Sequence, residues 1–397
     1  MFTPYRLCIT LALALVSAGV IACKHHPIPP IPLSTTDAWV IFINGQSNAQ
    51  GNAELTEDLY SPMRELAPDV SKVIPNVNIW NTQAHAWQPL QEGVNSRPVE
   101  DGSYPEGFTF AAKADGSWDV GNPAARYTMV GVGPEYGLAR AWQTIHPDAK
   151  LYIIKYSVGG TSLAELEKSN HKLYPNFLKY KQEAFAALTG KNIHVVGFYR
   201  NQGEADVKLS TGEYNDELYQ FYQDLASDGF TTDETKVVEA GCPIASDTGT
   251  PYSNPQNAVK QRFVSQDPDH RFYLDPSFVA LEHDEIHWNL ASQYYTGYVR
   301  LANIFFGAKN TLQAVTPDGP TLTYDAADHA AVVVPPTPAW PKKEFYYNLD
   351  GGTPHRLTTS WHIALGNQPV APGHLKVWIR AVPGRTKSAE AVNSITY

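Results

Sequence analysis

Short apolar runs alternate with helical stretches along most of the chain, and this alternation constrains the fold more than any other feature. The clearest runs are rich in β-branched and aromatic residues and cover residues 39–43, 150–156, 193–199 and 236–240. Each run stops at turn-forming residues, and helical patterns lie between the runs. Strands that alternate with helices form a parallel sheet with helices on both faces. The sequence therefore predicts an α/β domain over residues 37–307.

The pattern changes near Gly307, where prolines become frequent and the helical pattern ends. Short runs of the kind found in strands follow at 321–324, 331–334, 344–347 and 375–380. Strands at such short spacing are typical of small all-β domains. We expect a sandwich-like β domain over residues 308–397.

The first 36 residues are typical of targeting and tethering sequence. Their apolar run, residues 7–22, is about 16 residues long, whereas a membrane-spanning helix needs ~20. The run ends at Cys23 in a sequence that resembles a bacterial lipobox. This resemblance implies a lipoprotein signal peptide over residues 1–22 and a lipid anchor on Cys23, in an exported protein of the periplasm or cell surface. The alternative is a plain signal peptide cleaved nearby. We expect residues 23–36 to form a Pro-rich tether.

Charge, cysteine content and motifs exclude several classes of function. The net charge of −10 argues against nucleic acid as a partner. Only Cys242 would remain beside a lipidated Cys23 after signal removal, so an intrachain disulfide is not expected. The chain has no His-Glu-x-x-His motif, and no glycine-rich phosphate loop follows a predicted strand. We therefore expect neither a metal nor a cofactor.

Small and polar residues follow three of the predicted strands: Ser47, Gly159-Gly160 and Gln202. Because the carboxyl ends of parallel strands open onto one crevice, we expect these residues to lie close together. A serine hydroxyl is a possible nucleophile, and a glycine N–H and a carboxamide are possible donors to an oxyanion. Each residue also has a structural interpretation. Ser47 could cap a helix, the glycines could form a tight turn, and Gln202 could satisfy loop backbone groups.

Asp284 and His287 lie three residues apart, just before the last predicted helix of the α/β domain. An imidazole that accepts the serine proton and a carboxylate that orients the imidazole complete the requirements for serine hydrolysis. Alternatively, Asp284 caps the helix and His287 packs beside it. The combination of these groups with a serine at a strand end favours the catalytic interpretation.

Four sequence blocks resemble, in order, those of the SGNH hydrolase superfamily. The blocks are Gly45-Gln46-Ser47-Asn48, Gly159-Gly160-Thr161-Ser162, Gln202-Gly203-Glu204-Ala205-Asp206 and Asp284-Glu285-Ile286-His287. The first block resembles the variant of the sialate O-acetylesterase and acetylxylan esterase branch. This resemblance, which covers about residues 37–306, implies a three-layer, flavodoxin-like α/β/α fold. It also implies a serine esterase that removes O-acetyl groups from carbohydrates without a metal.

The resemblance also assigns roles to individual residues. It implies that Ser47 is the nucleophile, His287 the general base, and Asp284 the group that orients His287. The implied oxyanion hole consists of the N–H groups of Ser47 and of Gly159 or Gly160, together with the Gln202 side chain. The residues expected to support the site or its substrate pocket are Gln46, Asn48 and Glu204.

Three departures leave the acetylated carbohydrate undetermined between sialic acid and xylan-type glycans. Ala49 stands where the family often has Met, and Arg200 where it usually has Trp. Residues 91–127 form a long insert rich in Gly, Asp and aromatic residues. Two alternatives stay open: a non-catalytic glycan-binding lipoprotein, and an SGNH esterase that acts on non-sugar esters.

Overall fold

The structure is a computed structural model, and it describes most of the chain from Thr36 onward. The described residues are 36–53, 72–92, 95–96, 132–243, 254–279, 281, 286–314, 316–336, 344–357, 360–367, 370–381 and 386–394. The predicted signal peptide, Cys23, Asp284 and most of the predicted insert over residues 91–127 lie outside them. Among the described residues, no helix has the length and apolar character needed to cross a membrane.

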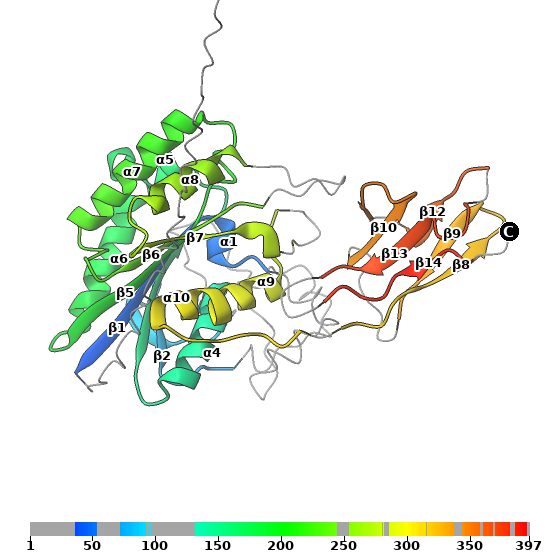
Figure 1. Cartoon of the computed structure of the whole chain (residues 1–397). Coiled ribbons are helices and arrows are strands. Elements are labelled where there is room, and N and C mark those ends of the chain that lie inside the picture. Colours follow the sequence, from blue (N-terminus) through cyan, green and yellow to red (C-terminus); the bar gives the residue numbers. More distant parts are fainter. Residues whose placement is uncertain are drawn as a thin grey trace, which may run out of the picture. The chain divides into compact units, whose positions relative to one another are not determined.

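A seven-stranded sheet forms the centre of the α/β part, in the order β3-β2-β4-β1-β5-β6-β7 (Figure 1). Its strands are β1 (Asp37–Gly45), β2 (Val77–Asn81), β3 (Ala86–Pro89), β4 (Leu151–Ser157), β5 (Asn192–Asn201), β6 (Lys236–Ala240) and β7 (Arg271–Leu274). All neighbouring pairs are parallel except β2 and β3. The central strand, β1, is buried over eight of its nine residues, which explains its continuous apolar sequence.

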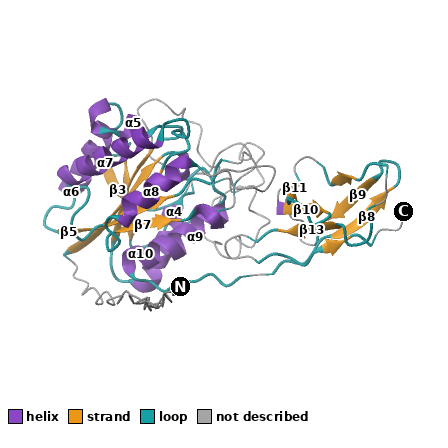
Figure 2. Ribbon diagram, turned by 45° about the horizontal axis from the view of Figure 1, so that its top comes forward, coloured by secondary structure: helices purple, strands orange, loops and turns teal. Residues whose placement is uncertain are grey.

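Helices cover both faces of this sheet, so the predicted α/β/α layers are confirmed (Figure 2). The longer helices are α4 (Pro134–Ile145), α6 (Tyr174–Ala186), α7 (Thr211–Ser227) and α8 (Pro255–Ser265). The shorter ones are α1 (Ser47–Gln50), α5 (Leu163–Leu166), α9 (Leu290–Tyr295) and α10 (Ala302–Phe306), with single turns at Lys168–Asn170 and Pro276–Phe278.

Each face has its own aromatic packing. On one face, Phe42 of β1 packs in one core with Phe177 of α6, Phe221 of α7 and Phe263 of α8. On the other face, the Trp142 ring of α4 lies 6.4 Å from the ring of Trp39 in β1 and 4.8 Å from that of Phe306 in α10. Aromatic pairs at such centroid distances bury large apolar areas, and they hold the helices onto the sheet.

The last predicted helix, over residues 290–306, is not one continuous α-helix. The π-helical turn Thr296–Leu301 separates α9 from α10. At this turn, Gly297 lies against α4 so closely that a Cβ would be 1.9 Å from the Pro134 carbonyl oxygen. The backbone of the π-turn therefore packs directly on that of α4, a contact that only glycine permits.

The residues after 320 form two antiparallel sheets, as the sequence predicts. One has the order β11-β10-β13-β14 and the other β12-β9-β8. Their strands are β8 (Thr321–Asp325), β9 (Ala330–Val334), β10 (Phe345–Leu349), β11 (His355–Arg356), β12 (His362–Ala364), β13 (Leu375–Ile379) and β14 (Ala391–Val392). Val333 of one sheet and Phe345, Val377 and Ile379 of the other belong to one buried cluster. The two sheets therefore share a core, as the layers of a sandwich do.

Candidate active site

Ser47 is the first residue of α1, at the carboxyl end of the central strand. The chain reaches it through Gly45, whose φ of 135° only glycine adopts readily; a Cβ there would lie 2.0 Å from the Asn201 carbonyl oxygen. The N-cap of α1 is Gln46, which makes no side-chain capping bond. The interpretation of Ser47 as a helix cap is therefore wrong. Ser47 instead stands at a sharp strand-to-helix turn, 6% exposed.

Backbone hydrogen bonds join the three strand ends that the sequence singles out. The Gln46 N–H donates to Asn201 O at 3.0 Å, which connects the end of β1 to the end of β5. The Val158 N–H donates to Gly45 O at 3.0 Å, which connects the loop after β4 to the same place. Gly159, half-buried, and Gly160, exposed with a left-handed φ of 73°, follow in that loop. The predicted meeting of these segments at one edge of the sheet is confirmed.

The side chain of Asn48 holds the segment that carries His287. Its Oδ1 accepts from the Trp288 N–H at 2.8 Å, and its Nδ2 donates to Ile286 O at 3.2 Å. These are the two residues on either side of His287. The same Nδ2 donates to Glu204 Oε1 at 2.7 Å, which connects the segment after β5 as well. We call this set of bonds the Asn48 clasp.

Asn52, which the sequence analysis did not single out, contacts the histidine itself. Its Nδ2 lies 3.4 Å from His287 Nε2, and the residue is 6% exposed. It follows Gly51, the left-handed residue that ends α1. In the sequence, Asn52 is distinguished only as a polar residue that directly follows a helix-ending glycine.

Gln202 lies fully buried beneath the loop after β4. Its Oε1 accepts from Arg200 Nη1 and from Tyr214 OH, each at 3.1 Å. Its Nε2 donates to Asp206 Oδ2 and, at 3.4 Å, to Thr161 O. The carboxamide nitrogen therefore faces the Gly159–Thr161 loop, and the oxygen faces the interior of the domain.

Lys260 supports the backbone of the same turn from below. Its ammonium group donates to Gln202 O and, at 2.7 Å, to Ala240 O. The Cys242 thiol also donates to Gln202 O, at 3.3 Å. Burial raises the pKa of this thiol, which therefore stays protonated. Neither Lys260 nor Cys242 lies in one of the four sequence blocks, so the sequence does not indicate that they support the site.

Gln46 and Glu204, the remaining supporting residues that the sequence predicts, also lie in this region. Gln46 Oε1 accepts from the Ala205 N–H at 3.3 Å, and Glu204 belongs to the Asn48 clasp. Residues of the first, third and fourth sequence blocks are thus joined in one hydrogen-bonded group, the fourth block through the Ile286 backbone carbonyl. Asp284, the predicted orienting carboxylate, is not among the described residues.

A second buried charged cluster lies under α1, at the start of α4. Glu135 accepts from Lys155 Nζ at 2.5 Å and from the Gly133 N–H at 3.2 Å. Burial raises the pKa of Glu135, and it raises the pKa of the neighbouring Glu92 further, with help from the Glu135 charge. Glu135 lies in the first turn of α4, and its ion pair with Lys155 of β4 is a tertiary contact.

Within the described part of the chain, one group of side chains has the arrangement of metal ligands. It consists of Asp325 of β8, Asp328 of the turn that follows and His362 of β12. All three are partly or fully exposed.

Comparison with known proteins identifies the family. Residues 37–306 match the family model described as carbohydrate esterase, sialic acid-specific acetylesterase. A search of curated proteins gave no match. Solved structures with similar folds include a protein from Arabidopsis thaliana, with 17% identity, a TM-score of 0.48 and coverage of 68% of this chain and 99% of that one. They also include NanS, with 14% identity, a TM-score of 0.43 and coverage of 70% and 98%.

A third similar structure is XAC1771, a carbohydrate acetylesterase from Xanthomonas citri, with 11% identity, a TM-score of 0.38 and coverage of 90% of this chain and 78% of that one. The assignment rests on the family model, which covers more than half of the sequence. The family that the four sequence blocks predict is confirmed. The chain belongs to the sialic acid-specific acetylesterase family of carbohydrate esterases and is a carboxylic ester hydrolase.

Proposed function

We propose that this esterase removes O-acetyl groups from sialic acid or xylan-type glycans with a Ser47–His287–Asp284 triad. The observation that carries the proposal is the Asn48 clasp. It bonds the residue after Ser47 to both neighbours of His287, across more than 230 positions of sequence. Asn52 contacts the His287 ring from the same turn. A hydroxyl and an imidazole supported in this way have the components of an activated nucleophile.

The reaction proceeds through an acetyl-enzyme. His287 accepts the Ser47 proton as the serine oxygen attacks the acetyl carbonyl, and the imidazolium then protonates the sugar oxygen as it leaves, which restores the sugar hydroxyl. Asp284 orients the imidazole. Water, activated by His287, hydrolyses the acetyl-enzyme and releases acetate.

The negative charge of the tetrahedral intermediate requires donors fixed in advance. We assign this role to the N–H groups of Ser47 and of Gly159 or Gly160, and to Gln202 Nε2. The position of Gln202 beneath the Gly159–Thr161 loop supports the assignment. Removal of one such donor costs about 10²–10³ in kcat in other hydrolases.

Acetate release by the purified full chain tests the proposal. The substrates are O-acetylated sialic acid and acetylated xylan, together with a long-chain aryl ester whose hydrolysis is followed by release of the aryl alcohol. Ser47→Ala and His287→Ala are expected to lower kcat on the order of 10⁶-fold. Two matched controls are expected to keep activity: Ser210→Ala, which removes the N-cap of α7, and His270→Ala, which removes an exposed ion pair with Asp267.

The outcome on the panel separates the alternatives. Acetate from either carbohydrate, abolished by Ser47→Ala, supports the proposal and identifies the substrate class. Turnover of the aryl ester alone would contradict the carbohydrate assignment. Full activity of Ser47→Ala would contradict the triad.

We also propose that a lipid on Cys23 anchors the enzyme to a bacterial membrane, facing the periplasm or the cell surface. The lipobox-like sequence before Cys23 supports this. Labelling of expressing cells with a clickable fatty acid is expected to mark the wild type and not Cys23→Ser, and the variant is expected to leave the membrane fraction. Equal labelling of both would contradict the anchor.

A further inference from the structure

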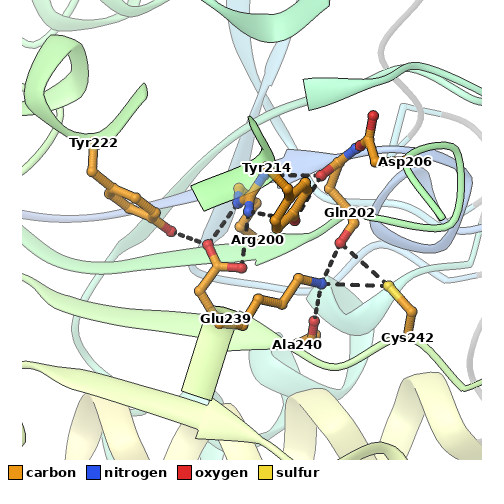
Figure 3. Close-up of polar contacts among 9 residues, drawn as sticks. Arg200, Gln202, Asp206, Tyr214, Tyr222, Glu239, Ala240 and Cys242 are labelled. Carbon is orange, nitrogen blue, oxygen red and sulfur yellow. Dashed lines mark hydrogen bonds and ion pairs between the residues drawn. The ribbon is translucent and has the colours of Figure 1, made fainter. Parts of the chain in front are cut away.

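A fully buried ion pair lies beneath Gln202, between the sheet and α7. Arg200 of β5 and Glu239 of β6 are direct partners in the strand register. The guanidinium donates to both carboxylate oxygens, from Nε at 2.6 Å and from Nη2 at 3.1 Å (Figure 3). Both side chains are 0% exposed. This geometry leaves the Nη1 edge of Arg200 directed at Gln202.

Two donors meet on the Gln202 carboxamide oxygen. Arg200 Nη1 and Tyr214 OH each donate to Oε1 at 3.1 Å (Figure 3). Burial raises the pKa of Tyr214 to about 12, so its hydroxyl remains a donor at neutral pH. An amide oxygen with two donors cannot exchange places with its nitrogen without breaking both bonds. The nitrogen is therefore fixed on the side of Thr161 and Asp206.

Stability alone does not explain a charged pair at this place. The cost of removing an arginine and a glutamate from water is large, and well-packed apolar residues in place of such a pair are often as stable or more stable. The aromatic rings of Phe221 and Tyr222 surround the guanidinium, at 5.5 and 5.9 Å, so the pocket could accept an apolar side chain. Besides the ion pair, the contacts that an apolar residue could not reproduce are the hydrogen bonds from Arg200 to Gln202 Oε1 and, at 3.2 Å, to Tyr214 OH.

On the nitrogen side, one of the two amide N–H groups has only a weak acceptor. Nε2 donates to the Asp206 carboxylate with one proton, and its contact with Thr161 O, at 3.4 Å, is long. A long, weak bond is given up at small cost when a negatively charged acceptor becomes available. Polarisation of the amide by the nearby guanidinium strengthens the remaining N–H as a donor.

We propose that Arg200 and Tyr214 are positioning residues of the esterase, which hold the Gln202 amide with its nitrogen toward the oxyanion of the tetrahedral intermediate. The proposal rests on the assignment of Gln202 to the oxyanion hole. It gives Arg200, the departure from the usual Trp, a role in the reaction rather than in sugar recognition. Because the oxyanion forms only in the transition state, the two residues act on kcat and not on KM.

The network offers a matched pair of variants in the full chain. Tyr214 and Tyr222 both project from α7 and are buried; Tyr214 OH donates to Gln202, whereas Tyr222 OH donates to Glu239 Oε1 at the opposite end of the ion pair. Each Phe variant loses one hydroxyl. Tyr214→Phe is expected to lower kcat about 10-fold with KM unchanged, less than the ~10²–10³ loss of a direct donor. Tyr222→Phe is expected to keep kcat within about 2-fold.

A double-mutant cycle with Gln202→Ala distinguishes positioning from a structural effect. In the Gln202→Ala background, Tyr214→Phe is expected to cause no further loss of kcat. Additive losses, or equal kcat losses in Tyr214→Phe and Tyr222→Phe, would overturn the proposal. Full kcat in Tyr214→Phe would overturn it too. Thermal unfolding, measured on each variant, checks that the native fold is retained.

A second variant tests Arg200 without leaving an unpaired buried charge. Arg200→Met combined with Glu239→Leu replaces the pair by apolar side chains and is expected to fold, with kcat lowered at least as much as in Tyr214→Phe. Wild-type kcat in this folded variant would overturn the proposal. A different result would show that the proposed function is wrong. In that case Ser47→Ala would retain activity, whatever the effect of the tyrosine variants.

Discussion

Replacement of Asn48 by alanine is expected to loosen the His287 segment from α1 while the side chains of Ser47 and His287, the proposed nucleophile and base, remain. The Asn48 clasp joins α1 to both neighbours of His287, with hydrogen bonds of 3.2 Å to Ile286 O and 2.8 Å from the Trp288 N–H. Without it, the Trp288 N–H and the Ile286 carbonyl lose their partner on α1. His287, the proposed base, would then be held less firmly relative to Ser47, with the Asn52 contact remaining.

The expected magnitude follows from the bonds lost. Asn48 is 0% exposed, and its side chain makes hydrogen bonds of 2.8 Å to the Trp288 N–H, 3.2 Å to Ile286 O and 2.7 Å to the Glu204 carboxylate. Two neutral bonds contribute about 1 kcal/mol each and the charged one about 2 kcal/mol, so the free energy of unfolding should fall by about 4 kcal/mol. A displacement of the base by about 1 Å should lower kcat on the order of 10²-fold.

Asn303→Ala provides the control. Asn303 also uses its amide to bracket one backbone segment, with Oδ1 accepting from the Asn310 N–H at 2.9 Å and Nδ2 donating to Asn310 O at 3.1 Å, but it lies on α10. The Asn303→Ala variant should be less stable than the wild type and should keep the wild-type kcat. Urea unfolding and acetate release, measured on both variants, separate the two effects. Wild-type kcat in folded Asn48→Ala would refute the reasoning, as would an equal kcat loss in Asn303→Ala.

Three further expectations concern the interior. Gly45→Ala should destabilise the fold by at least about 3 kcal/mol because its Cβ would meet Asn201 O at 2.0 Å, and a wild-type urea midpoint would contradict this. Burial raises the pKa of Glu92 and Glu135 above 4.5, so these two groups hold more protons in the folded state than in the unfolded state, and their contribution to stability is present in full below that pH and is lost as pH rises above it. Glu92→Gln should therefore show a smaller fall in Tm between pH 5 and 8 than the wild type, and equal falls would contradict this. Cys242, buried and with its pKa raised, should react with a thiol reagent only after unfolding, as peptide mapping by mass spectrometry would show.

The sequence predicts most of the sheet because its strands are buried on both faces. An apolar run of this kind is visible without any knowledge of its neighbours, and β6 occupies the predicted residues 236–240. The sequence analysis missed β3 (Ala86–Pro89), a short, partly exposed strand at the edge of the sheet. Its partner, β2, stabilises it, and its own composition gives no such signal. The π-turn before α10 was missed for a similar reason, since the contact of Gly297 with α4 is tertiary.

The same distinction holds for the site. The proximity of Ser47, Gly159 and Gln202 follows from the rule that parallel strands end at one edge, and it could be predicted. The partners of Gln202 could not, because they depend on the register between β5 and β6 and on which face of α7 packs onto the sheet. From the sequence, Arg200 was only a departure from a family pattern.

The Asn48 clasp also affects the order in which the protein acquires activity during folding. Its bonds join residues 238 and 240 positions apart, so they form only after a very long loop has closed. Contacts of such high sequence separation form slowly, and a chain still being synthesised has α1 long before it has the Ile286–Trp288 segment. An incomplete chain would carry Ser47 without His287, its proposed base. Onset of esterase activity would then report completion of the α/β fold rather than formation of its first strands.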